Sequence, residues 1–140
     1  MLRAVKRYKQ KAPRLYSVRW LETRLDELTS QIVRLRGEGC VTCPALTNLQ
    51  CGHIFTRAWR PTRWDIAEGG NCHVQCERCN QAHEGNPEPF RNYYIKCFGK
   101  RAFDRLEQRA ASHDKIGYAE LYEKWEAYTQ ILAEEKKRAA

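Results

Sequence analysis

The chain has 140 residues, of which 25 are Lys or Arg and 17 are Asp or Glu, so its formal net charge is +8. This length suits one domain with a modest core, and the basic balance favours a polyanionic partner. No run approaches the eighteen apolar residues of a transmembrane helix, and the first fourteen residues lack the apolar segment of a secretory signal. We therefore expect no membrane partner and a reducing cytoplasm, where seven cysteines favour metal ligation over disulfides.

Two elements are expected before the first cysteine. Residues 1–16 should form a flexible basic arm, in which Lys6 and Arg7 are candidates for DNA contact. Residues 17–37 should form a helix, because apolar residues recur at spacings of three and four from Val18 to Leu35 and two glycines follow. Such a heptad seam can pair with a second copy or lie on this chain's own later helices, and the pattern leaves both outcomes open.

The rest of the chain predicts a mainly α fold around a small core. Residues 38–99 are expected to hold that core, with a short strand in "LQCGHIF" and a helix that begins near Glu77 or Cys79. Helical periodicity returns in "FRNYYIKCF", where Cys97 is expected to be a buried thiol. Residues 100–140 are expected to form C-terminal helices with a stripe of aromatic and aliphatic residues.

A second basic stretch, "TRAWRPTRW", places Arg57, Arg60 and Arg63 among Trp59 and Trp64. Arginines suit phosphates, and indoles can stack on exposed bases. The plainer interpretation is a set of solvated cations beside half-buried tryptophans. Together with the basic arm, the stretch makes nucleic acid the leading expected partner.

Two C-x-x-C pairs, Cys40 with Cys43 and Cys76 with Cys79, predict a closed structural zinc site. Such a zinc would hold together a loop-rich middle that has few apolar residues, because its binding energy is folding energy. The fourth ligand stays open at this point, since three other residues could replace one of these cysteines: Cys51, Cys72 and His73.

Around these pairs the sequence resembles the HNH, or ββα-metal, endonucleases. The matching text is "CVTC", "CGHIFTR", "RWD" followed by "NCHVQCERCNQ", and "GNPEPFRNYYIKCFGKRAFDRLEQ", which spans roughly residues 40–108. More narrowly it is similar to phage recombination proteins of the NinG/Rap type, which are related in motif to the junction-cleaving endonuclease VII. The resemblance implies a zinc-stabilised ββα-metal core and a setting in the cytoplasm of a phage-infected bacterial host.

The resemblance also implies roles for single residues. His53 would be the general base that takes a proton from water, and Asn71 would orient it. Asn80 would be an oxygen ligand to one catalytic Mg²⁺ or Mn²⁺, which would stabilise charge on the phosphate. Arg57 would help to hold that phosphate.

One position departs from the broader family. Many HNH nucleases carry an acid or a histidine immediately before the base, where this chain has Gly52, although the NinG type is also expected to have Gly-His there. Asp65, His83 or Glu84 could replace the missing ligand, and the sequence does not choose among them.

Each candidate also has a plainer interpretation. His53 could be an ordinary strand histidine, Asn71 a turn former, Asn80 a helix cap and Asp65 an ion-pair partner. Gly85 and Asn86 would then end a short helix.

The sequence therefore predicts a metal-dependent endonuclease for branched recombination DNA, such as Holliday junctions or D-loops. It would act as a homodimer, because a dimer suits paired cuts. The alternatives are a non-catalytic zinc module that binds DNA or a protein partner, and an RNA-binding or RNA-cleaving protein.

Overall fold

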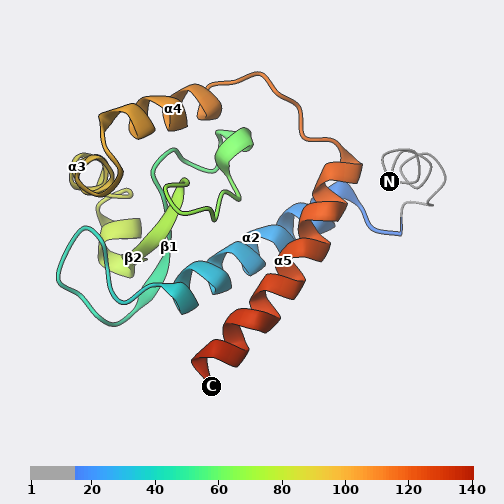
Figure 1. Cartoon of the computed structure of the whole chain (residues 1–140), viewed down its shortest axis with the longest axis horizontal. Helices are drawn as coiled ribbons and strands as arrows, with labels where there is room; N and C mark the ends of the chain where they lie inside the picture. Colours follow the sequence, from blue (N-terminus) through green and yellow to red (C-terminus); the bar gives the residue numbers. More distant parts are fainter. Residues whose placement is uncertain (1–14) are drawn as a thin grey trace.

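The computed structural model describes residues 15–140, so Lys6, Arg7 and most of the expected arm lie outside the described residues. The described residues are mainly helical, as the sequence predicts, and they contain one two-stranded antiparallel sheet (Figure 1). The elements in chain order are α2 (Val18–Arg36), β1 (Leu49–His53), the 3-10 turn η1 (Arg60–Thr62), β2 (Cys72–Cys76), the π-type turn η2 (Arg78–Ala82), α3 (Pro87–Phe98), α4 (Lys100–Ala110) and α5 (Tyr118–Ala139).

Helix α2 begins where Ser17 caps it, because the Ser17 hydroxyl accepts a hydrogen bond from the Trp20 backbone N–H at 3.0 Å. Its heptad seam packs along α5, and the two helices lie side by side in Figure 1. The residues fully buried in this contact are Leu21, Leu25, Ile32 and Leu121. Of the two outcomes left open for the seam, the structure has the intramolecular one.

The β1–β2 hairpin lies between the α2–α5 pair and helices α3 and α4 (Figure 1). Its register pairs Leu49 with Cys76 at one end and His53 with Cys72 at the other. Since strand side chains alternate, one face of the hairpin carries six residues: Leu49, Cys51, His53, Cys72, Val74 and Cys76. This face packs toward α2, where Val33 meets Val74 and Cys72.

The opposite face of the hairpin carries Gln50, Gly52, His73 and Gln75. It packs toward η2 and α3, and the His73 ring lies edge-on to Phe90, with centroids 6.0 Å apart. The two faces therefore present different sets of functional side chains to different parts of the protein.

The helix expected near Glu77 or Cys79 is only the short turn η2. It ends early because Glu84, Gly85 and Asn86 all take positive φ, at 52°, 85° and 50°. Pro87 then opens α3.

Helices α3 and α4 close the far side of the sheet. Tyr94 and Phe103 are buried between them, and the Tyr94 hydroxyl donates to the Gly69 carbonyl at 2.5 Å. The expectation of a buried Cys97 is wrong. Cys97 is exposed, because the inward stripe of α3 runs beside it through Phe90, Tyr94 and Phe98. Within residues 15–140, none of the helices is long and apolar enough to cross a membrane.

Candidate functional site

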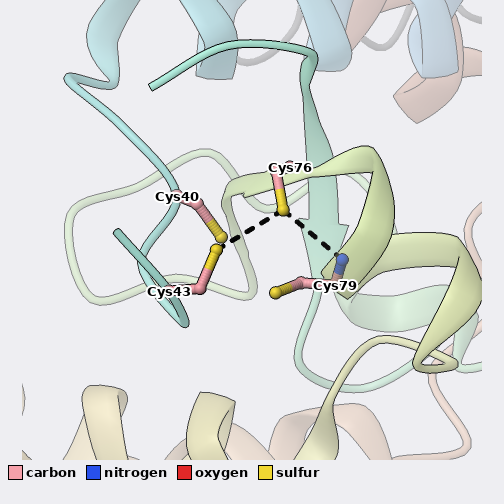
Figure 2. A group of neighbouring side chains, drawn as sticks. All are labelled: Cys40, Cys43, Cys76 and Cys79. Atoms are coloured by element: carbon pink, nitrogen blue, oxygen red, sulfur yellow. Dashed lines mark hydrogen bonds between the residues drawn. The ribbon is translucent and has the colours of Figure 1, made fainter. Parts of the chain in front are cut away.

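The four cysteines of the two C-x-x-C pairs meet at one end of the hairpin. Cys40 and Cys43 come from the loop after α2, while Cys76 ends β2 and Cys79 lies in η2. Their sulfur atoms all lie within 4.8 Å of one another, and the side chains point toward a common centre (Figure 2). Cys43 Sγ and Cys76 Sγ are 3.5 Å apart.

Backbone amides point at these sulfurs. The Cys79 N–H donates to Cys76 Sγ at 3.4 Å, and the Ala45 N–H donates to Cys43 Sγ at 3.5 Å. Such bonds favour thiolates over thiols and are compatible with a bound cation. The cluster could therefore bind a metal ion such as zinc, held by Cys40, Cys43, Cys76 and Cys79.

The thiols of the cluster differ in acidity. Burial acts to raise the pKa of Cys40, but hydrogen bonds from Thr42 and the backbone outweigh it and bring that pKa to about 6. The Ala45 N–H lowers the pKa of Cys43, yet burial and the neighbouring thiols outweigh this bond and raise the pKa to about 12. Four close sulfurs cannot all carry negative charge without a positive ion among them.

None of the three alternative fourth ligands joins this cluster. Cys51 and Cys72 lie in a second group with His53, and the three ligand atoms are within 4.8 Å of one another. His73 faces the other side of the sheet, where its Nε2 donates to the Gly70 carbonyl at 2.8 Å.

His53 is half-buried at the end of β1, and its Nε2 is 2.9 Å from the Arg63 carbonyl oxygen. Because a carbonyl can only accept, Nε2 carries the hydrogen and Nδ1 keeps its lone pair. Burial lowers the pKa of His53, although the bond to the Arg63 carbonyl opposes it. The imidazole is therefore neutral near pH 7 and has a nitrogen able to accept a proton.

Asn71 is fully buried and holds the loop that follows His53. Its Oδ1 accepts from the Phe55 N–H at 2.8 Å, and its Nδ2 donates to the carbonyls of Phe55 and Thr62 at 2.8 and 3.1 Å. The side chain thus fixes the backbone before η1, at Phe55, and at the last residue of η1, Thr62, and not the His53 ring itself.

Asn80 lies on the other side of the hairpin from His53. Its Nδ2 donates to Gln50 Oε1 at 2.9 Å, and Gln50 points away from the face that carries His53. The plainer interpretation of Asn80 as a helix cap does not apply, because it lies inside η2 and not at its start. The structure does not bring Asn80 and His53 into one cluster.

The other suggested ligands of a catalytic ion have separate surroundings. Asp65 accepts from Arg109 at 2.9 Å and from the Ala67 N–H at 3.2 Å, so it is an ion-pair partner. His83 and Glu84 are exposed just after η2. Among residues 15–140, no group of three close His, Cys, Asp or Glu side chains includes Asp65, His83 or Glu84.

Gly52 has a packing reason for its lack of a side chain. A Cβ there would lie 2.2 Å from Gln75 Oε1, an oxygen with no hydrogen-bond partner among the described residues. The Gln75 amide takes the space, and its Nε2 donates to the Gly85 carbonyl at 2.9 Å. An acid at position 52 would displace a fully buried side chain.

The basic and aromatic stretch divides into structural and exposed members. Arg63 makes two hydrogen bonds to Asp26, and Arg60 pairs with Glu22 at 2.5 Å. Arg57 is 61% exposed although its Nη1 also pairs with Asp26 Oδ2 at 3.5 Å, and Trp59 is 45% exposed, so both side chains are accessible from solvent.

Sequence reasoning missed three partners of the candidate residues. Glu22 and Asp26 lie four residues apart on α2, which places them on one helix face opposite the arginines. Gln50 alternates with Cys51 in β1, so period-2 alternation could have placed it on the face of Asn80.

The described residues thus form a small, mainly helical protein with a two-stranded sheet and a cysteine cluster that could bind a metal ion. The chain belongs to the NinG family, because the family model described as Bacteriophage Lambda NinG protein matches residues 3–138.

Curated relatives agree with this assignment. The chain is 33% identical over 104 residues to "Protein ninG" of Escherichia phage 933W and, separately, of Salmonella phage P22, which covers 72% of this chain and 49% of each relative. The corresponding protein of Escherichia phage lambda is 32% identical, with 48% of it covered. The chain thus spans about half the length of the curated relatives it matches, and no solved structure gives a significant match.

Proposed function

We propose that this chain is a DNA endonuclease of the ββα-metal class that acts on branched recombination intermediates in the cytoplasm of a phage-infected cell. The observation that carries the proposal is the hydrogen bond from His53 Nε2 to the Arg63 carbonyl, which leaves Nδ1 free as a base. Membership of a phage protein family and the four-cysteine cluster support it, and that cluster would hold a structural zinc.

The proposed chemistry at His53 is phosphodiester hydrolysis. Nδ1 takes a proton from water, the water oxygen attacks phosphorus, and the bond to the 3′ oxygen breaks. The 3′ oxygen leaves with the bonding pair and takes a proton from solvent water, and the imidazolium returns its proton to solvent. Arg57 and Trp59 are exposed close to η1 and are suited to contact the phosphate and a base. Asn71 acts as a positioning residue, since it fixes the loop that supplies the Arg63 carbonyl.

The amide of Asn80 and the carboxylate of Asp65 have separate hydrogen-bond partners. The Asn80 amide is bonded to Gln50, and Asp65 is bonded to Arg109. These side chains therefore do not form a ready site for Mg²⁺ or Mn²⁺, and the ion requirement is to be measured.

The separation of Asn80 from His53 favours a second candidate function. A non-catalytic zinc module that binds DNA or a recombination partner would keep the cysteine cluster, Arg57 and Trp59, and would need no contact between His53 and Asn80. A homodimer stays compatible with either function, but its interface would lie away from the seam that α5 covers.

The deciding experiment is cleavage of a labelled four-way junction, the matching linear duplex and a single-stranded RNA, with Mg²⁺, Mn²⁺ or neither. Wild type is compared with His53→Ala and with Asn80→Ala, after metal analysis shows equal zinc content. The proposal expects cutting that prefers the junction and is lost in His53→Ala, and the reactions with Mg²⁺, Mn²⁺ or neither measure its ion requirement. Tight binding without cutting under either ion would establish the binding module, and preferred cutting of RNA would reassign the substrate.

A further inference from the structure

The hairpin face toward α2 carries a second set of soft metal donors. Cys51 and His53 are alternate residues of β1, and Cys72 pairs with His53 in the register. Both thiols and the imidazole therefore project from the same face, and their ligand atoms lie within 4.8 Å of one another.

These distances suit a small tetrahedral cation after minor adjustment. Zinc bonds of about 2.3 Å to sulfur and about 2.0–2.1 Å to nitrogen place neighbouring donors roughly 3.5–3.8 Å apart. The three ligand atoms, which lie within 4.8 Å of one another, are thus at most about 1 Å farther apart than bound donors would be. Two thiolates and an imidazole suit Zn²⁺ and poorly suit Mg²⁺, which prefers oxygen.

The site is distinct from the four-cysteine cluster. That cluster lies where Leu49 pairs with Cys76, four residue pairs along the hairpin from His53 and Cys72. At about 3.3 Å per residue the two ends are roughly 13 Å apart. A cation at one end could not share ligands with a cation at the other.

A simpler explanation is that Cys51 and Cys72 are small apolar residues packed beside Val33 and Val74. That explanation does not account for the imidazole. An apolar core has no need of a polar ring, yet His53 lies beside both sulfurs, and the Arg63 carbonyl is 2.9 Å from its Nε2 and 3.5 Å from Cys72 Sγ. The His53 ring and the Cys72 sulfur thus both lie next to the Arg63 carbonyl.

We propose that Cys51, His53 and Cys72 form a second, soft-metal site that takes Zn²⁺ or a cation of similar chemistry. Occupation of the site engages the imidazole, so the cation inhibits any reaction that uses His53 as a base. The inhibition rests on the proposed function, whereas the binding of the cation does not.

Metal stoichiometry tests the site directly. The full chain, kept reduced and loaded with one zinc per molecule, is titrated with Zn²⁺ and, in a separate series, with Co²⁺. Bound metal is counted after gel filtration, and thiolate-to-cobalt absorption reports sulfur ligation. Wild type should bind a second equivalent, whereas Cys51→Ala and Cys72→Val should bind it more than about tenfold less tightly. Cys97→Ser is the matched control, because Cys97 is an exposed thiol on α3, and it should bind as wild type does.

Two results would overturn the proposal. One is a wild-type protein that saturates at one equivalent, and the other is an unchanged second equivalent in both Cys51→Ala and Cys72→Val. Cys72→Val keeps an apolar side chain in the buried position, and its circular dichroism shows whether a loss of binding comes from unfolding.

A cleavage assay then tests the inhibition. Each cutting rate, measured with Mg²⁺ or Mn²⁺, is expressed relative to that of the same protein without added Zn²⁺. Wild type should be inhibited at Zn²⁺ concentrations more than about tenfold lower than those that inhibit Cys51→Ala. If wild type does not cut at all, the proposed nuclease function fails and the titration alone still decides the metal site. Equal sensitivity of wild type and Cys51→Ala would show that the site does not control His53.

Discussion

The guanidinium of Arg63 makes two hydrogen bonds to the carboxylate of Asp26, from Nε at 3.0 Å and from Nη2 at 2.6 Å. The same residue's carbonyl accepts the hydrogen bond of His53, and Asp26 also accepts from Trp64 Nε1 at 2.8 Å. Asp26 therefore anchors the backbone at Arg63 to helix α2, and this backbone orients the candidate base His53.

Asp26→Asn should weaken this anchor, because an amide cannot accept two charge-assisted hydrogen bonds from Arg63. The side chains of Asp26 and Arg63 are 19% and 21% exposed. We therefore expect a loss of about 2–3 kcal/mol in the free energy of unfolding, near the low end of the cost of breaking a buried ion pair. Urea denaturation measures it. Glu27→Gln is the matched control on the next residue of α2, because its pair with Arg24 is half-exposed and should contribute less than about 1 kcal/mol. Equal effects of the two substitutions would show that the Arg63 contact is not an anchor.

The Asp26 contact also shows where sequence reasoning stopped. Heptad spacing and two glycines were sufficient to place α2, and the two C-x-x-C pairs were sufficient to place the cysteine cluster, since both signals are local. The partner of Arg63 is 37 residues away, and no local pattern distinguishes a cation that binds phosphate from one that binds another helix. The same holds for Asn80, whose partner depends on which face of the hairpin η2 covers.

Asn71→Asp should destabilise the loop between the strands. The substitution keeps the size of the side chain but replaces the Nδ2 donor with an oxygen, which then faces the carbonyls of Phe55 and Thr62. Because Asn71 is fully buried, we expect a loss of about 2–4 kcal/mol, measured by urea denaturation. Asn92→Asp, on the exposed side of α3, changes the same chemistry at the surface and should cost less than about 0.5 kcal/mol. If Asn71→Asp is no worse than Asn92→Asp, the three hydrogen bonds of Asn71 do not hold the loop.

Removal of the cation from the four-cysteine cluster should unfold the middle of the chain. Structural zinc contributes roughly 10–16 kcal/mol in small zinc-binding peptides, so we expect Cys76→Ser or a strong chelator to cost more than about 4 kcal/mol. Metal content and thermal unfolding followed by circular dichroism measure the effect. Cys97→Ser, at an exposed thiol, should keep both the metal and the melting temperature. A Cys76→Ser protein that melts as wild type does would mean that the cluster has no structural metal.

The seam of α2 should determine stability and not association. Leu25 is fully buried against α5, so Leu25→Ala should cost about 2–5 kcal/mol. Val18, at the end of the same seam, is 37% exposed, and Val18→Ala should cost less than about 1 kcal/mol. Sedimentation analysis of the folded variants should show the wild-type oligomeric state in both. A change of oligomeric state in Val18→Ala would indicate that the exposed end of the seam contacts a second copy.

Tyr94 should make the protein sensitive to alkaline pH. Burial raises the pKa of its hydroxyl, and a phenolate could not donate to the Gly69 carbonyl. The unfolded chain then loses its proton at about pH 10 while the folded chain retains it, so the free energy of unfolding falls as pH rises above about 10.

The loss attributable to this one group is at most about 1.4 kcal/mol per pH unit. Tyr94→Phe should cost about 0.5–1.5 kcal/mol at pH 7, where the hydrogen bond is lost, and should remove part of the alkaline dependence. Urea unfolding of both proteins from pH 7 to pH 11 should therefore give stability curves that converge at high pH, because the wild type loses its advantage there. Parallel curves over this range would mean that Tyr94 ionises equally in the folded and unfolded chains, and that its contact with Gly69 does not hold α3 against the loop before β2.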